Sequence, residues 1–270
     1  MSSPISPSTA VAVRPPRNSG VCSAGARRLF SSAACVLACA SVGAHDGHTG
    51  GIQTAPSATV APAFDIVHTK ITTIGNVAVF HIAVSGEGGG SKPAKSGKLA
   101  GSSVFSYVWP TTIDPSAVGF EPKSGILALA VTSHPDFDDT PLFDENGDGD
   151  RGNDGNVWHS HWVVLQPDNA CGKNALKVAD IPPGAKPRLP KTWPGLPILI
   201  DSPGWSPSFQ GRSLEVRVPF DDIGVVGGAR FDGVTAALRV HESVHNPLLC
   251  VVDVFKTASG DLSLPGKPNR

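Results

Sequence analysis

The sequence predicts an all-β protein, a single antiparallel β-sandwich of the jelly-roll type that follows an N-terminal signal peptide. Short runs of β-branched and aromatic residues recur along the chain, and many of its 30 glycines and 25 prolines lie between them. Helical periodicity is scarce, and only residues 221–225 have a pattern that fits one helical turn. Many short strands separated by glycine and proline are typical of a β-sandwich.

The first 44 residues have the charge order of an export signal. They contain four arginines and no acidic residue, and Arg27-Arg28 precedes an apolar run at 29–44. This order is typical of a secretory signal, and the run is too short to span a membrane. Arg27-Arg28 begins the sequence RRLF, which resembles the core of a twin-arginine signal; an ordinary secretory signal is the alternative. We therefore expect a periplasmic or secreted protein that starts near Ser41 or His45, or a lipoprotein attached through Cys39.

The rest of the chain divides by composition. We expect residues 45–62, which are small and polar, to form a flexible linker, residues 63–262 to form the β-sandwich domain, and residues 263–270 to form a tail. A domain of about 200 residues is large enough for one core. Within it, the Gly/Ser/Lys-rich residues 86–103 and the proline-rich residues 182–197 are expected to be loops.

Strands are expected where β-branched and aromatic residues gather between these loops. The first two runs are separated by Gly75-Asn76, a pair that predicts a hairpin. The expected strands are, in order, residues 64–71, 77–84, 105–109, 126–132, 158–165, 198–201, 213–219, 234–240 and 249–255.

The cysteine count and the net charge after residue 44 indicate the compartment of the protein and argue against nucleic-acid binding. Only Cys171 and Cys250 follow residue 44, and two cysteines in an oxidising compartment most simply form one disulfide. All 23 acidic residues also follow residue 44, together with 18 of the 22 basic residues. A mildly acidic domain without a basic motif is not expected to bind nucleic acid. No transmembrane helix is expected.

An acidic loop at residues 144–155, DENGDGDRGNDG, is the first candidate site. Hard cations need several oxygen ligands around one point, and this loop offers them at alternate positions. It is not an EF-hand, because the twelfth position is glycine instead of glutamate. We expect a calcium site; the alternative is a solvated turn, for which the same residue types are ordinary. The expected ligands are Asp144, Asn146, Asp148, Asp150 and Asp154, with Asp136, Asp138 or Asp139 as further candidates to complete the shell.

Two histidines in the sequence WHSHW form the second candidate site. On a strand, His159 and His161 share one face, whereas Trp158 and Trp162 share the other. Two imidazoles on one face can hold zinc or copper if a third ligand approaches, and His134 or a carboxylate of the acidic loop is the candidate. The alternative is a half-buried strand that presents its histidines to solvent.

Two further metal motifs carry less weight. His241, Glu242 and His245 spell HExxH, which in zinc peptidases lies on a helix and brings its histidines one turn apart. Here a strand precedes the motif and Pro247 follows it, so we interpret the match as chance and a metallopeptidase as a remote third hypothesis. If cleavage exposed His45 as the N-terminus, its amine and imidazole would be able to chelate copper.

Three segments resemble the DOMON and family-9 carbohydrate-binding type of β-sandwich. These are residues 77–84, residues 211–223 (GRSLEVRVPFDDI) and residues 231–240. Haem-binding DOMON domains often use methionine and histidine as axial ligands, but Met1 is the only methionine, so that mode is not carried over. The resemblance supports the fold more than the function. The five tryptophans offer faces that can stack on sugars, and the alternative is that they belong to the core. A carbohydrate or another cell-envelope component is the candidate ligand. The leading hypothesis is therefore a non-enzymatic, exported calcium- and ligand-binding protein, and the alternative is a periplasmic copper or zinc protein.

Overall fold

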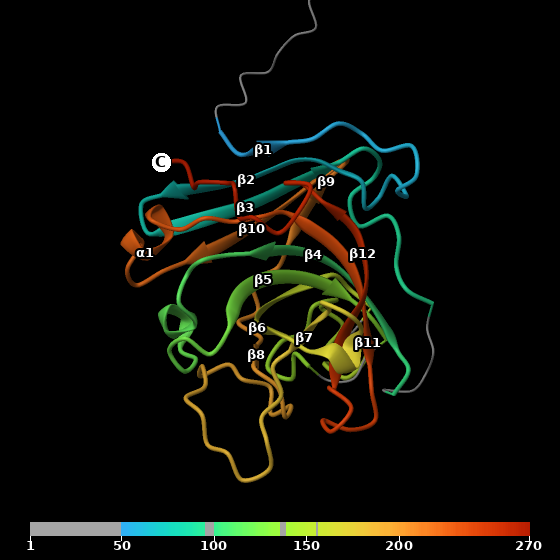
Figure 1. Ribbon diagram of the computed structural model, residues 1–270, viewed down its shortest axis with the longest axis vertical. Coiled ribbons are helices and arrows are strands. Elements are labelled where there is room, and N and C mark those ends of the chain that lie inside the picture. Colours follow the sequence, from blue (N-terminus) through green and yellow to red (C-terminus); the bar gives the residue numbers. More distant parts are fainter. Residues whose placement is uncertain (1–49, 95–99, 136–138, 155) are drawn as a thin grey trace, which may run out of the picture. The chain divides into compact units, whose positions relative to one another are not determined.

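The computed structural model describes residues 50–94, 100–135, 139–154 and 156–270 and shows two antiparallel β-sheets in two layers (Figure 1). The predicted signal peptide at residues 1–44 lies outside the described residues. Strands dominate, as the sequence predicts, and among the described residues no helical segment exceeds the four residues of the 3-10 helix η1 (Pro115–Val118) and of α1 (Gly224–Gly227). The all-β class and the antiparallel pairing are thus confirmed.

The first layer is a five-stranded sheet. Its strand order is β1-β2-β3-β10-β9, and β2 and β3 form the predicted hairpin, in which Gly75 adopts a positive φ of 60°. A positive φ suits glycine because other residues are strained there. The strands are β1 (Ile52–Gln53), β2 (Ile66–Ile74), β3 (Val77–Val84), β9 (Ser208–Gln210) and β10 (Ser213–Pro219).

The second layer closes on itself. Its order is β5-β4-β11-β12-β7-β6, and β5 also pairs with β6, so six strands form a closed barrel with β8 attached to β6. The expected two-sheet sandwich is therefore corrected to one sheet packed on a barrel, because β5 has partners along both of its edges. The strands are β4 (Ser103–Pro110), β5 (Ile126–Ser133), β6 (His159–Pro167), β7 (Leu176–Val178), β8 (Ile200–Asp201), β11 (Val234–Val240) and β12 (Leu249–Thr257).

Side-chain alternation along the barrel strands produces two separate cores. On β6, Trp162 and its like-facing neighbours pack against the five-stranded sheet, where the Trp162 ring lies 5.8 Å from the ring of Phe80. Residues of opposite parity, such as Val163, face the barrel interior and pack with valine, leucine and alanine from the other barrel strands. The barrel wall therefore has one face toward each core, as period-two strands require.

Both ends of the described chain pair with the five-stranded sheet. Ile52 and Gln53, within the expected linker at 45–62, form β1 on the edge of β2. Asn269, within the expected tail at 263–270, bridges to Thr72 of the same strand. Backbone groups of these flanking segments are thus satisfied by the sheet edge.

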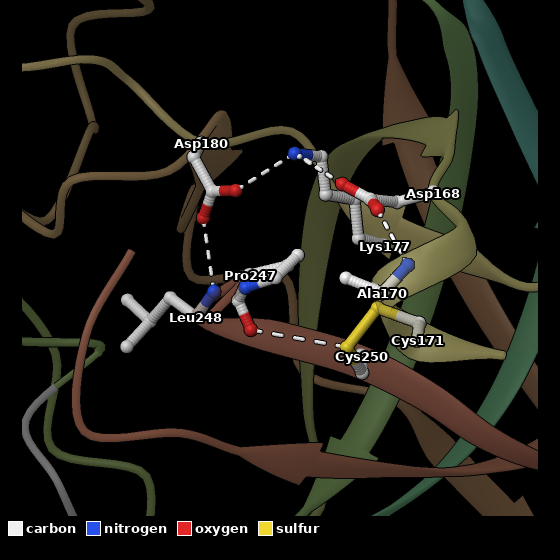
Figure 2. The surroundings of a disulfide bond; sticks show 8 residues. All are labelled: Asp168, Ala170, Cys171, Lys177, Asp180, Pro247, Leu248 and Cys250. Atoms are coloured by element: carbon white, nitrogen blue, oxygen red, sulfur yellow. Dashed lines mark hydrogen bonds and ion pairs between the residues drawn. A yellow bond between two sulfur atoms is a disulfide. The ribbon is translucent and has the colours of Figure 1, made fainter. Parts of the chain in front are cut away.

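The barrel has a narrow seam between β7 and β12, where the register pairs only Cys250 with Lys177 (Figure 2). Beside this pair, Cys250 is joined to Cys171 in the predicted disulfide, with a Cα–Cα distance of 5.4 Å. Lys177 Nζ lies 2.9 Å from a carboxylate oxygen of both Asp168 and Asp180. One covalent bond and a three-residue ion cluster therefore reinforce the place where the barrel has the fewest strand pairings.

Candidate metal centre

Four metal-ligating side chains meet on the inner face of the barrel wall. His159 and His161 alternate on β6 and face inward, where Thr132 of β5 lies opposite His159. His134 directly follows β5, and Asp139 comes from the connection between β5 and β6. All four are almost fully buried, with exposed fractions of 1% for His134 and His161 and 3% for Asp139 and His159. The histidines therefore point into the barrel, and the alternative that they face solvent is wrong.

The four side chains converge on one point. The Asp139 carboxylate lies 3.1 Å from His134 Nε2, 3.2 Å from His161 Nε2 and 3.6 Å from His159 Nε2. His134 Nε2 and His159 Nε2 are 3.0 Å apart. One ligand atom from each residue lies within 4.8 Å of all the others, and no other group of three or more histidine, cysteine or acidic side chains does so in the described ranges.

Hydrogen bonds on the far side of each ring determine which nitrogen faces the centre. His134 Nδ1 lies 2.9 Å from the Pro135 carbonyl oxygen, and His159 Nδ1 lies 2.7 Å from that of Val157. A carbonyl only accepts, so in both neutral rings Nδ1 carries the proton.

His161 follows the same pattern through a serine. Ser202 Oγ donates its only proton to the Asp139 carbonyl oxygen at 2.6 Å, so it must accept from His161 Nδ1 at 3.0 Å. When it is neutral, each of the three rings therefore directs an unprotonated Nε2 toward Asp139. Donation of the other ring N–H to a fixed oxygen is the usual support of a metal-binding histidine.

This arrangement requires a cation. Two Nε2 lone pairs at 3.0 Å repel each other unless a proton or a metal ion lies between them. Ligands about 2.0–2.2 Å from a tetrahedral zinc ion lie about 3.3–3.6 Å from one another. His134 and His161 lie 3.1 and 3.2 Å from one Asp139 oxygen and His159 lies 3.6 Å from the other, so these separations are of that order, although the ligand atoms as a set spread over up to 4.8 Å.

Without a metal, the negative charge of Asp139 is compensated by protonation within the histidine cluster. Burial alone would raise the pKa of Asp139, but the nearby charges of His134, His161 and His159 hold it well below its ordinary value. Burial alone would lower the pKa of His159, but attraction to Asp139 raises it overall. Burial lowers the pKa of His161 more than Asp139 raises it. A proton on His159 is thus the cation that a metal ion would replace.

The acidic loop is arranged differently. Asp144 accepts backbone N–H bonds from Gly147, Asp148 and Gly149, so both of its carboxylate oxygens are engaged. Asn146, Asp148 and Asp150 each accept from the N–H two residues on, at 2.8–3.0 Å. These bonds form local turns, which is the alternative that the sequence offered for this loop.

The last expected calcium ligand, Asp154, is buried, whereas Asn146, Asp148 and Asp150 of the loop are exposed. Asp154 accepts the N–H of Glu145 at 2.9 Å, so it anchors the base of the loop. Asp136 and Asp138 lie outside the described residues. Asp139 lies in the histidine cluster instead of the acidic loop. The described residues therefore do not gather the expected ligands around one point, and calcium binding stays a prediction.

The HExxH motif lies in the connection between β11 and β12. His241, Glu242 and His245 fall between Val240, the last residue of β11, and Leu249, the first of β12, and no helix forms there. Because the motif is not helical, it lacks the geometry in which zinc peptidases place the two histidines one turn apart. His45 lies outside the described residues.

The sequence identified three of the four cluster residues for a shared transition-metal site. It named His159 and His161 from their alternation and His134 as a third ligand. The sequence offers Asp139 only to the calcium shell, and the carboxylate that it offers to the histidine pair is one from the acidic loop. Nothing in the residue pattern distinguishes Asp139 from its acidic neighbours, because its role depends on the fold of the β5–β6 connection.

Comparisons with protein-family models, with curated proteins and with solved structures yield no match to this chain. The resemblance to DOMON and family-9 carbohydrate-binding domains gains no match from these comparisons, so no function is taken from it. Among the described residues, no helix has the length and apolar character needed to cross a membrane.

Proposed function

We propose that this protein is an exported metal-binding protein whose barrel holds one divalent transition-metal ion at His134, Asp139, His159 and His161. The observation that carries the proposal is the inward orientation of three histidine Nε2 atoms around one buried carboxylate. Their Nδ1 atoms all donate outward to oxygen acceptors. The arrangement is thus pre-organised for a cation, and folding alone gives no reason for it.

The ligand set favours zinc. Calcium prefers six to eight oxygen ligands, and three imidazoles do not supply them. Copper(II) prefers a square-planar or tetragonal arrangement, whereas three histidines and one carboxylate are a ligand set that suits tetrahedral zinc. Four protein ligands complete a tetrahedral shell, which is typical of a structural site. The ion would then tie the β5–β6 connection to the barrel wall.

The proposal of an exported protein rests on different observations. The basic-then-apolar leader at residues 1–44 supports it, as does the disulfide between Cys171 and Cys250. An oxidising compartment keeps such a disulfide intact.

The test is the metal content of the protein purified from the exporting cell without added metal or chelator. We expect about one zinc per chain by elemental analysis, and His161→Ala should lose most of it because one of four ligands is removed. His245→Ala, an exposed histidine of the HExxH motif, is the matched control and should keep the metal. Wild-type protein that is metal-free and does not bind added zinc or copper would refute the proposal.

A further inference from the structure

The barrel interior contains an apolar cavity next to the four-residue cluster. Its volume is about 80 Å³, and its lining includes His134, Asp139 and His161. Most other lining residues are valine, leucine, isoleucine or alanine, among them Ala130 and Ala236, and the polar exceptions are Ser106 and Thr132. The wall is therefore largely apolar, and its titratable side chains are those of the metal ligands.

This cavity also reaches the protein surface. Val254 on β12 and Leu262 both line it, although they are 48% and 49% exposed. Exposed apolar side chains are common on protein surfaces, so the informative point is that these two also line the cavity. Val254 lies beyond Cys250, the residue of β12 that is paired in register with β7. The outer end of the cavity is therefore lined by apolar side chains.

The size and chemistry of the cavity restrict what it can hold. Its volume is about half of the roughly 150 Å³ of an engineered apolar cavity that binds benzene or xenon. A polar or charged molecule would lose its hydration and find few hydrogen-bond partners on walls that are mostly valine and leucine. Besides the metal ligands, the polar lining residues are Ser106 and Thr132, whose hydroxyls already have partners within the protein.

We propose that the barrel cavity binds a small uncharged apolar molecule, of the size of a diatomic gas or a short aliphatic group, against the metal centre. The proposal deepens the proposed function, because it rests on a metal at the four-residue cluster and adds a ligand class to it.

Xenon is a suitable probe because it is uncharged, apolar and small enough for this volume. We expect the ¹²⁹Xe chemical shift to change saturably when xenon is titrated with the zinc-loaded wild-type protein. Ala236→Leu adds three carbon atoms to the cavity wall and should abolish the saturable change. Val225→Leu enlarges an exposed residue of α1 that does not line the cavity, and it should leave xenon binding unchanged.

Cobalt(II) in place of zinc tests whether the site adjoins the metal. The paramagnetic ion should broaden the signal of bound xenon if xenon lies against the ligand cluster, and zinc should not. The inference is overturned if xenon binds equally well to Ala236→Leu. It is also overturned if cobalt does not broaden the NMR signal of bound xenon. If Ala236→Leu fails to fold by circular dichroism, Ala130→Val narrows the same cavity from β5 and takes its place.

Metal content measured on the same samples separates the two proposals. Protein that contains stoichiometric zinc but gives no saturable xenon shift contradicts the cavity proposal alone. Protein that binds no metal but gives a xenon shift lost in Ala236→Leu contradicts the proposed metal site, and with it the claim that the cavity ligand contacts a metal.

Discussion

The acidic loop at residues 144–154 and the four-residue cluster of His134, Asp139, His159 and His161 are both rich in potential metal ligands, yet they use them in opposite ways. In the loop, carboxylates turn back to accept their own backbone N–H groups, as Asp144 does from Gly149. In the cluster, the ring N–H groups donate outward and leave lone pairs directed at one another. A metal site therefore depends less on the number of potential ligands than on whether their lone pairs are free of protein hydrogen bonds and point toward one another.

Burial explains why the difference has energetic consequences. Loop side chains such as Asp148 are exposed, so water screens their repulsion and no counter-ion is needed. Asp139 is buried, and a buried carboxylate is costly unless a cation compensates it. The cluster is therefore the region in which binding of a metal should change stability.

The largest expected effect is the response of stability to zinc. A metal that binds only the folded state stabilises by about 4 kcal/mol at a thousandfold excess over its Kd. For a domain of this size, about 4 kcal/mol corresponds to a shift in Tm of about 8–16 °C. We expect the wild-type protein to melt that much lower after removal of zinc by EDTA, as measured by differential scanning calorimetry.

Two variants make this result specific to the cluster. His159→Ala should melt at the same temperature with zinc and with EDTA, because the site loses a ligand. Asp148→Ala, in the acidic loop, should keep the full zinc response. A response lost in Asp148→Ala and retained in His159→Ala would reverse the roles assigned to the two regions.

Removal of the disulfide tests whether the cluster depends on complete closure of the barrel. The Cys171→Ala/Cys250→Ala double variant should lose about 2–5 kcal/mol of unfolding free energy, because the unfolded chain is no longer constrained. Its zinc stoichiometry should be unchanged, since no cluster residue comes from β7 or β12. Urea denaturation and elemental analysis measure the two quantities. A folded double variant without zinc would show that the seam helps to position the ligands.

A smaller effect is expected from the groups that orient the rings. Ser202→Ala removes the acceptor of His161 Nδ1–H, and loss of such outer partners typically weakens metal affinity about 10–100-fold. Ser160→Ala is the matched control: Ser160 is a buried serine between the two β6 histidines, but its hydroxyl donates to Trp205 on the opposite side. Competition with a chromogenic zinc chelator gives both affinities. Equal affinity in Ser202→Ala and the wild type would contradict the tautomer assigned to His161.

Zinc affinity should also fall by about tenfold for each pH unit below the pKa of His159, because binding displaces one proton there. The sign follows from the raised pKa of His159. In the metal-free protein, its ion pair with Asp139 contributes stability that is fully present below the unfolded pKa of about 6.5 and lost as pH rises through the folded pKa. Zinc and this proton compete, so the zinc-induced shift in Tm should shrink from pH 7.5 to pH 5.5. A shift that grows on acidification would contradict the model of one displaced proton.

Features set by neighbouring residues could be predicted from the sequence, whereas features set by distant parts of the chain could not. The sequence predicted that His159 and His161 share one face of β6, because residues two apart on any strand lie on the same face. Closure of the barrel and the position of Asp139 depend on pairing between distant strands, which no local pattern encodes. The acidic loop was favoured as a site because its composition is visible in sequence, whereas the backbone N–H groups that satisfy it appear only when the loop is folded.

Calcium is expected to give the smallest effect, and it is the direct test of the acidic loop. To bind calcium, Asp144 and its neighbours would have to exchange their backbone hydrogen bonds for ion contacts. These bonds lie in solvent, so the exchange gains little, and the effect should stay within about 0.5 kcal/mol, as for ordinary surface changes. We therefore expect millimolar calcium to shift the Tm of zinc-loaded protein by less than about 2 °C. A larger shift that Asp148→Ala abolishes and His159→Ala retains would show that the loop rearranges into the calcium site that its sequence predicts.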